Sequence, residues 1–258
     1  MAKAAGKKQK KRKYLWLLLV CTGVALATCI GYVLYKQNEA KFAVYPGYDI
    51  ELPLGYVMHG IDVSYYQGFI YWPLVKKMKV KDVTIDFAFI KATEGLGNTD
   101  KQFNRNWQQA RAAGITRGAY HFFIAGKSGK LQAQGFIKKV KLLPGDLPPV
   151  LDVEQLYGSD ATTMRSEVNE WLQTIEAAYH VKPFIYTNVD FYEHHLGKDF
   201  NEYPLWIAHY FVERKPRTKA DWLFWQHNDG GKVNGIKTKV DFNVFKGDSA
   251  AFKALLVQ

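Results

Sequence analysis

The chain has 258 residues, of which 48% are hydrophobic, 15% aromatic and 23% charged. This composition excludes a disordered or fibrous chain, and the length allows one large core or at most two small ones. The formal net charge of +11 suggests a nucleic-acid partner, but residues 1–35 hold seven basic residues and no acidic one. The remainder has 28 basic and 24 acidic residues, a net charge of only +4, so we expect no nucleic-acid partner.

The N-terminal region is typical of a membrane anchor. Residues 14–35 carry no charge, and a helix of that length spans the roughly 30 Å hydrocarbon core of a bilayer. We predict a basic cytoplasmic tail over residues 1–13 and a transmembrane helix over 14–35. The protein would then be a single-pass protein of the inner, or cytoplasmic, membrane, with its catalytic part facing the periplasm or cell wall. A cleaved signal peptide is the alternative, but its apolar region is normally shorter, about 7–15 residues.

The exported part contains neither of the two cysteines, Cys21 and Cys29, so it has no disulfide and no Cys-based zinc site. This suits a bacterial envelope protein. Residues 36–57 contain Pro46 and Pro53 and show no clear period, which predicts a stalk or linker. A globular domain over residues 58–258 is expected to follow.

Within that domain, strand-like and helix-like segments alternate, which favours a parallel sheet covered by helices. Asp160 is placed to cap the longest helix. Strands are expected at residues 58–64, 87–93, 116–123, 149–154 and 183–188, helices at 72–78, 103–113, 131–140 and 162–179, and three closely spaced strands at 205–210, 222–227 and 240–245.

Five βα units followed by three β segments make eight strands, enough to close a barrel filled by side chains. We therefore predict an α/β protein with an irregular, TIM-like (β/α)5β3 barrel of parallel-type strands. The alternative is an open doubly wound sheet, but residues 64–68 (SYYQG) after the first strand are not a glycine-rich phosphate loop.

Acidic residues are expected at the carboxyl ends of the barrel strands, where active sites of such barrels lie. Asp62 falls near the end of the first strand, Asp152 and Glu154 at the end of the fourth, and Asp241 at the start of the last. Strand alternation puts Asp152 and Glu154 on one face, where two close carboxylates in apolar surroundings cannot both ionise easily. Such a pair suits glycoside hydrolysis, in which one carboxyl protonates the leaving oxygen and the other stabilises positive charge. A solvated surface pair and a metal site are the alternatives.

Aromatic residues accompany the strand ends and could stack on sugar rings. We expect this of Tyr186 and Tyr210, whereas simple core packing is expected of Phe122 and Trp225. Buried, hydrogen-bonded roles rather than catalysis are expected of six of the seven histidines. His194 and His195 fall in a predicted loop, and four lie in or near strands: His59, His121, His209 and His227.

In this order the motifs resemble the glycoside hydrolase family 25 lysozymes, also called Chalaropsis-type N-acetylmuramidases. The resemblance covers about residues 58–247. The matching segments are residues 59–64 (HGIDVS) with Gln67-Gly68, 87–95 (FAFIKATEG), 118–123 (GAYHFF), 151–154 (LDVE), 185–187 (IYT), 205–210 (LWIAHY), 225–226 (WQ) and 240–243 (VDFN).

The resemblance implies cleavage of the β-1,4 bond between N-acetylmuramic acid and N-acetylglucosamine, with net retention and no cofactor. It implies that Glu154 is the general acid. Asp152 would orient the substrate or stabilise positive charge, through the substrate's own N-acetyl group. Asp62 and Asp241 would complete the acidic cleft. The resemblance also implies five sugar contacts: Lys91, Tyr120, Tyr186, Trp206 and Tyr210.

The partners expected are therefore peptidoglycan strands and, through residues 14–35, a lipid bilayer, with the protein acting as a monomer. Two other functions stay open. One is a non-catalytic glycan-binding or scaffold protein on the same barrel, against which the presence of all four acidic residues argues. The other is a hydrolase of a different N-acetyl-hexosamine polymer such as chitin.

Overall fold

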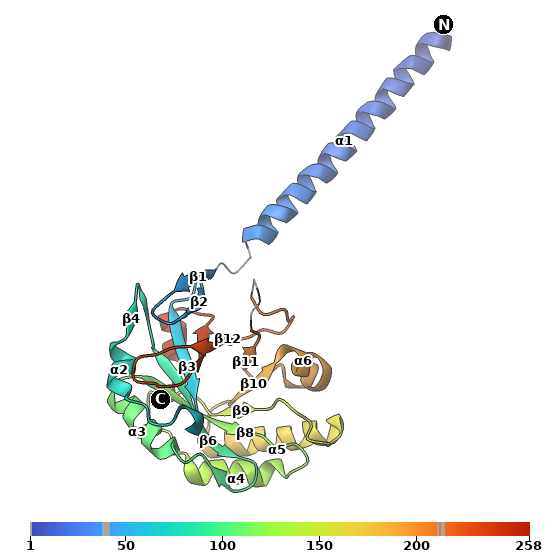
Figure 1. Ribbon diagram of the computed structural model, residues 1–258. Coiled ribbons are helices and arrows are strands. Elements are labelled where there is room, and N and C mark those ends of the chain that lie inside the picture. The colour runs from blue at the N-terminus through green and yellow to red at the C-terminus, as the bar shows by residue number, and fades with distance from the viewer. Residues whose placement is uncertain (1, 38–41, 211, 213–214) are drawn as a thin grey trace. The chain divides into compact units, whose positions relative to one another are not determined.

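The protein forms two units, residues 1–40 and residues 41–258 (Figure 1). The computed structural model describes residues 2–37, 42–210, 212 and 215–258. In the first unit, α1 (Ala2–Gln37) is one continuous helix. Its segment Tyr14–Lys36 has a mean hydropathy of 2.3 over its most apolar part, none of which is buried against protein. By length and composition this segment could cross a membrane, as the sequence predicts.

The second unit is built on a closed sheet of eight strands. β3 pairs with β6 on one side and with β13 on the other, and this double pairing closes the barrel. The predicted (β/α)5β3 barrel is thus confirmed. Its strands are β3 (Met58–Val63), β6 (Phe87–Glu94), β8 (Thr116–Phe122), β9 (Val150–Asp152), β10 (Phe184–Asn188), β11 (Leu205–Ala208), β12 (Phe224–Gly231) and β13 (Val240–Phe245).

One strand departs from the predicted all-parallel pattern. β13 runs antiparallel to both of its neighbours, β12 and β3, while the other neighbouring strands pair in parallel. The expectation of eight parallel-type strands was wrong at this position. The connection over residues 232–239 is too short for a crossover, which needs about a dozen residues or more, so the chain turns straight back.

Helices follow each of the first five strands, as expected for the βα part of the barrel. Asp160 caps α5 as predicted, since its side chain accepts hydrogen bonds from the backbone N–H groups of Thr162 and Thr163, both at 2.9 Å. The fifth helical segment is short and irregular. The helices are α2 (Trp72–Lys77), α3 (Phe103–Ala112), α4 (Gly129–Lys139), α5 (Ala161–Tyr179), α6 (Val189–Phe191) with η2 (Tyr192–Leu196) and η3 (Gly197–Phe200), and finally α7 (Ser249–Ala254).

Part of the predicted stalk belongs to the compact unit. β1 (Phe42–Tyr45) and β2 (Ile50–Pro53) form an antiparallel hairpin. In its turn, Tyr48 is fully buried and its hydroxyl donates to the backbone oxygen of Val83 at 3.1 Å. These strands are too short for a period to be visible in the sequence, so residues 42–53 resembled a linker. Two further short pairs flank the barrel strands: β4 (Lys79–Val80) with β5 (Val83–Thr84), and β7 (Asn98–Thr99) on the end of β6.

Aromatic rings fill the barrel beneath the strand ends. Phe252 of α7 packs against Phe87, Phe224 and Phe245 with ring centroids 5.3–6.3 Å apart, which closes the amino-terminal end of the barrel. Burying a Phe side chain contributes about 1.5–3 kcal/mol, so this cluster is a major part of the core. Trp225 is fully buried, which confirms its predicted packing role.

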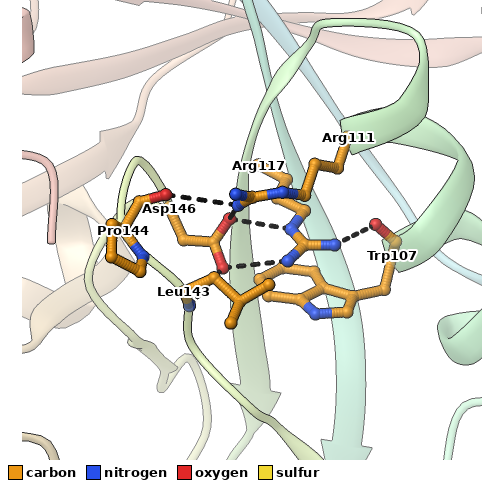
Figure 2. Close-up of polar contacts among 6 residues, drawn as sticks. All are labelled: Trp107, Arg111, Arg117, Leu143, Pro144 and Asp146. Atoms are coloured by element: carbon orange, nitrogen blue, oxygen red, sulfur yellow. Dashed lines mark hydrogen bonds and ion pairs between the residues drawn. The ribbon is translucent and has the colours of Figure 1, made fainter.

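A buried ion pair holds the start of β8 (Figure 2). The Arg117 guanidinium donates twice to the Asp146 carboxylate, at 2.8 and 3.0 Å, and also to the backbone oxygen of Trp107, on whose ring it stacks at 3.8 Å. Asp146 also accepts from the Leu143 N–H at 2.9 Å and from the more exposed Arg111 at 3.2 Å. The pair thereby joins α3, β8 and the loop before β9.

Candidate active site

A cavity of about 290 Å³ lies at the carboxyl ends of the parallel strands and holds all the predicted site residues. The end of β3 supplies Asp62, the end of β9 supplies Asp152, and Glu154 follows two residues later. Asp241 reaches the same end because β13 is antiparallel and starts there. The other predicted residues on the wall of this cavity are Lys91, Tyr120, Tyr186, Trp206 and Tyr210.

Asp62 and Asp241 form the first pair of carboxyl groups. They are register partners on β3 and β13. The Oδ2 atom of Asp62 accepts two amide hydrogen bonds, from Gln226 at 2.8 Å and from Asn243 at 2.7 Å. Burial raises the pKa of Asp62, and the amide donors offset part of that rise. Burial, together with the charge of Asp62, raises the pKa of Asp241 to about 9. At neutral pH this pair therefore keeps a proton, and Asp241 holds it.

Asp152 and Glu154 form the second pair. Asp152 is only 6% exposed, whereas Glu154 is half-buried on the cavity wall. Burial raises the pKa of both groups, and the charge of Glu154 adds to the rise at Asp152. Lys91 acts in the opposite direction on both. The pair as a whole retains a proton at pH values at which isolated carboxyl groups would be ionised.

Gln226 connects two tyrosines of the cavity wall to the carboxyl group of Asp62. Its Oε1 atom accepts hydrogen bonds from the hydroxyls of Tyr186, at 2.7 Å, and of Tyr210, while its amide nitrogen donates to Asp62. Asn243 plays a parallel part, since it accepts from the indole N–H of Trp206 at 2.8 Å and donates to the same carboxylate. Both amides are almost fully buried. The site is thus a connected hydrogen-bond network rather than a set of separate side chains.

Lys91 of β6 also lines the cavity and is held by two contacts. Its Nζ atom donates to the Glu94 carboxylate at 2.6 Å and lies 4.5 Å from the centre of the Phe122 ring. Phe122 also lines the cavity, so the prediction that it only packs in the core was wrong. The signal was present in the sequence, because Phe122 and the predicted contact Tyr120 are two residues apart on β8 and share a face.

Sequence reasoning assigned no role to Gln226 or Asn243, although both fall in the family motifs. Asn243 is two residues from Asp241 on the same strand face, and Gln226 ends the parallel part of β12 next to β11. Buried amides cannot be assigned from one sequence, because their partners lie far away in the chain. Tyr66 also lines the cavity, and the sequence analysis assigned it no role.

The histidines lie outside the cavity, as expected for residues without a catalytic role. His121 is fully buried between Thr93, at 2.7 Å, and Gln132, at 3.0 Å, which confirms a hydrogen-bonded core role. His227 is buried, but neither ring nitrogen has a hydrogen-bond partner within the described residues. Residues 194 and 195 lie in the helical turn η2 rather than in a loop.

The remaining predicted histidine roles are mixed. His59 is buried and its Nε2 pairs with the backbone oxygen of Tyr56 at 3.0 Å, as expected. His209 is only half-buried, and its Nδ1 accepts from the backbone N–H of Arg217 at 3.2 Å. In the ranges that the structure describes, no cluster of three or more His, Cys, Asp or Glu side chains is arranged to hold a metal ion.

Comparison with known proteins agrees with this geometry. The family model described as "Glycosyl hydrolases family 25" matches residues 61–236. The "Uncharacterized protein YegX" of Escherichia coli (strain K12) is 44% identical over 207 residues, which are 80% of this chain and 76% of that protein. "Lysozyme M1" of Streptomyces globisporus is 36% identical over 77% of this chain and 71% of that protein.

Two solved structures extend the likeness to the fold. The bacterial lysozyme from Streptomyces coelicolor superposes with a TM-score of 0.69 and 35% identity, over 77% of this chain and 96% of that chain. A family 25 glycosyl hydrolase from Bacillus anthracis superposes with a TM-score of 0.72 and 31% identity, over 78% of this chain and 94% of that chain. The chain therefore belongs to family 25 of the glycosyl hydrolases and is a glycoside hydrolase of the lysozyme type.

Proposed function

We propose that this chain is a membrane-anchored peptidoglycan hydrolase that cleaves the β-1,4 bond between N-acetylmuramic acid and N-acetylglucosamine. The observation that carries the proposal is the convergence of four carboxyl groups, Asp62, Asp152, Glu154 and Asp241, in one aromatic-lined cavity of a family 25 barrel. Carboxyl groups suffice for the proton transfer and charge stabilisation of glycoside hydrolysis. In this proposal the enzyme acts as a monomer.

Glu154 acts as the general acid. Of the second carboxyl pair it is the member more open to the cavity, where a glycosidic oxygen can reach it. Burial raises its pKa, which favours the protonated form that a general acid needs, while a hydrogen bond with Asp152 acts in the opposite direction.

Asp152 orients the substrate. Its Oδ1 atom is buried and has no hydrogen-bond partner in the part of the chain that the structure describes. Leaving such an oxygen unsatisfied costs free energy, and the N–H of a substrate N-acetyl group would satisfy it. The acetamido oxygen could then attack the anomeric carbon as Glu154 protonates the leaving oxygen and the glycosidic bond breaks. Water, which gives a proton back to Glu154, would then attack the same carbon and release the acetamido oxygen, and these two inversions give net retention. Asp152 would stabilise the positive charge that develops on the acetamido group.

The other residues of the cavity position the glycan. Asp62 and Asp241 complete the acidic floor, and the sugar units contact Lys91 and the four aromatic residues on the wall: Tyr120, Tyr186, Trp206 and Tyr210. Aromatic faces suit the C–H surfaces of pyranose rings, while hydroxyl and indole N–H groups suit their polar edges.

The N-terminal helix would hold the enzyme at the cytoplasmic membrane, with the N-terminus inside the cell. The length and hydropathy of Tyr14–Lys36 support this, and so do the basic residues that precede it. Cell fractionation with an intact-mass measurement tests the anchor. We expect the chain in carbonate-washed membranes with residues 14–35 still present. If most of the protein in the cell is a processed, released domain, the proposed anchor is wrong, but the proposed enzymatic activity is unaffected.

The activity is tested on the full-length chain in detergent micelles, incubated with purified peptidoglycan, with the products reduced and identified by mass spectrometry. New chain ends that carry reduced muramic acid are expected from the wild type and absent with Glu154→Gln. Glu170→Gln makes the same change on an exposed position of α5 and should leave the products unchanged.

Other products would indicate a different function. Reduced glucosamine ends would make the enzyme a glucosaminidase. Cleavage of chitin but not peptidoglycan would assign a different N-acetyl-hexosamine polymer. Binding of peptidoglycan with no cleavage would favour the non-catalytic scaffold.

A further inference from the structure

Two tyrosines directly after β3 form a stacked pair at the edge of the catalytic cavity. Tyr65 and Tyr66 lie on the 3-10 turn η1 (Tyr65–Gln67), with ring centroids 4.2 Å apart and an angle of 30° between the rings. Tyr66 is 70% exposed. A single exposed aromatic residue needs no explanation, but a stacked pair beside an active site indicates a surface for a ligand ring.

The turn that carries the pair is fixed at several points. Ser64 and Gln67 form a capping box, in which the Ser64 N–H donates to the Gln67 side chain at 2.8 Å. The backbone N–H of Tyr65 donates to the Asp100 carboxylate at 2.7 Å, and the Gln67 amide donates to the backbone oxygen of Lys239 at 3.2 Å. The pair is therefore pre-organised, and binding a ligand to it would order little additional chain.

Among the residues that the structure describes, one broad face of the pair is left open. The Nζ atom of Lys101 lies over the Tyr65 ring, 4.8 Å from its centre, and Tyr66 stacks on the same ring. Because the ammonium group and the second ring cannot share one face, Tyr65 is held between them. The outer face of Tyr66 is left exposed.

The pair bridges two cavities that meet at Lys91. Tyr66 lines the catalytic cavity, and Tyr65 lines a second cavity of about 400 Å³ that also contains Lys91, Glu94 and Asp100. Because Lys91 belongs to both walls, the cleft continues past the carboxyl groups along this side of the barrel.

We propose that the Tyr65–Tyr66 pair is an additional saccharide-binding site, on which a pyranose ring of the glycan strand, beyond the two sugars of the cleaved bond, stacks against Tyr66. The inference rests on the proposed function, since it takes the occupant to be the same glycan. A pyranose is favoured over a peptide or an anion because the exposed surface is a flat aromatic face that carries no charge. Stacking on Tyr66 increases the affinity for long glycan strands and does not change the rate of bond cleavage.

The test uses the full-length chain in detergent micelles. Binding of a disaccharide and of an octasaccharide of the peptidoglycan glycan repeat is measured by calorimetry on the inactive Glu154→Gln protein, with and without Tyr66→Ala. We expect Tyr66→Ala to weaken octasaccharide binding about 3- to 10-fold and so lower the octasaccharide-to-disaccharide affinity ratio. Tyr66→Phe keeps the ring and should restore the ratio. Tyr71→Ala removes another exposed tyrosine, one that lines neither cavity, and should leave it unchanged.

Kinetics on long strands supply a second readout. Tyr66→Ala in the otherwise wild-type chain should raise KM by a similar factor with kcat unchanged. The inference is wrong if Tyr66→Ala binds the octasaccharide as tightly as its parent, if Tyr71→Ala weakens it equally, or if no variant binds it. If the ratio falls as expected while the wild type cleaves nothing, the saccharide site stands and the proposed hydrolysis fails.

Discussion

Asp62 and Asp241 face each other in register across the antiparallel pairing of β3 with β13. Two buried carboxyl groups this close cannot both ionise. The two amide donors, Gln226 and Asn243, both act on Asp62. They stabilise the ionised form of Asp62 and leave the proton on Asp241, whose pKa rises to about 9 because of burial and the neighbouring charge. The placement of the two amides on one member of the pair thus decides which carboxyl group carries the proton.

Asp241→Asn should make stability less dependent on pH. The pKa of Asp241 is about 9 in the folded state against an ordinary value of 3.8, so the folded state binds the additional proton between these values. Stability is then lost as pH rises from about 4 to 9, by at most about 1.4 kcal/mol per pH unit. Asparagine has nearly the same shape as aspartic acid, but its side chain does not titrate. Urea denaturation at pH 5.5, 7 and 8.5, followed by tryptophan fluorescence, should give a shallower decline for the variant.

The control is Asp199→Asn, which removes a carboxylate of 73% exposure and should leave the wild-type pH dependence in place. An Asp241→Asn protein with the same decline as the wild type would mean that Asp241 is ionised in the folded state.

Gln226→Leu should impair catalysis and change its pH profile. The substitution leaves the hydroxyls of Tyr186 and Tyr210 without their common acceptor and removes one of two amide donors to Asp62. Loss of the acceptor for the buried Tyr186 hydroxyl costs about 1–3 kcal/mol, so kcat/KM should fall roughly 10- to 100-fold. The apparent pKa of the acidic limb should also rise, because the carboxylate has lost a donor.

Gln132→Leu is the matched control, since Gln132 is equally buried but bonds to His121 and Ile124 away from the cavity. It should lower stability and leave the pH profile in place. If both variants shift the profile alike, Gln226 acts only through the general integrity of the fold.

Much of the barrel could be predicted from the sequence because its strands are nearly uniform apolar runs separated by helical spacing. The four acidic residues were found because strand ends fall where those runs stop, and Asp152 and Glu154 share a face by simple alternation. The direction of β13 escaped prediction, since strand pattern is the same for both directions and only the length of the preceding connection distinguishes them.

The parts that escaped prediction depend on distant partners. The hairpin of β1 and β2 becomes recognisable as structure only through Tyr48, whose hydroxyl bonds Val83 in another segment. Gln226 bonds Asp62, which is 164 residues away in the chain. A propensity or a period describes neighbours in sequence, so it cannot reveal a contact of this kind.

Asp146→Ala should destabilise the protein strongly without altering the site. The substitution removes the carboxylate that pairs with the Arg117 guanidinium, which stays buried because its side chain is only 3% exposed. Removing one partner of a buried pair costs about 3–5 kcal/mol. Arg111→Ala tests the outer partner, 46% exposed, and should cost less than about 1 kcal/mol. Urea denaturation midpoints measure both, and similar small losses for the two variants would contradict a dominant inner pair.

His227→Phe should protect the fold against acid. His227 is buried between Trp225 and Phe242, with ring centroids 5.6 and 6.5 Å away, and burial lowers its pKa from 6.5 to about 3. Below pH 6.5 His227 binds a proton in the unfolded chain but stays neutral in the folded state. Stability is therefore lost as pH falls from about 6.5 towards 3. Phenylalanine fills a similar volume and does not titrate.

The measurement is the free energy of unfolding at pH 7, 5.5 and 4.5 for His227→Phe, the wild type and His194→Phe, which replaces a histidine of 67% exposure. The decline should be shallower only in His227→Phe, by up to about 1.4 kcal/mol per pH unit. Asp241 acts in the opposite direction over this range, but it is common to all three proteins and cancels in the comparison. Equal declines in the three proteins would mean that His227 takes up its proton in the folded state, which would require an acceptor beside its ring nitrogens.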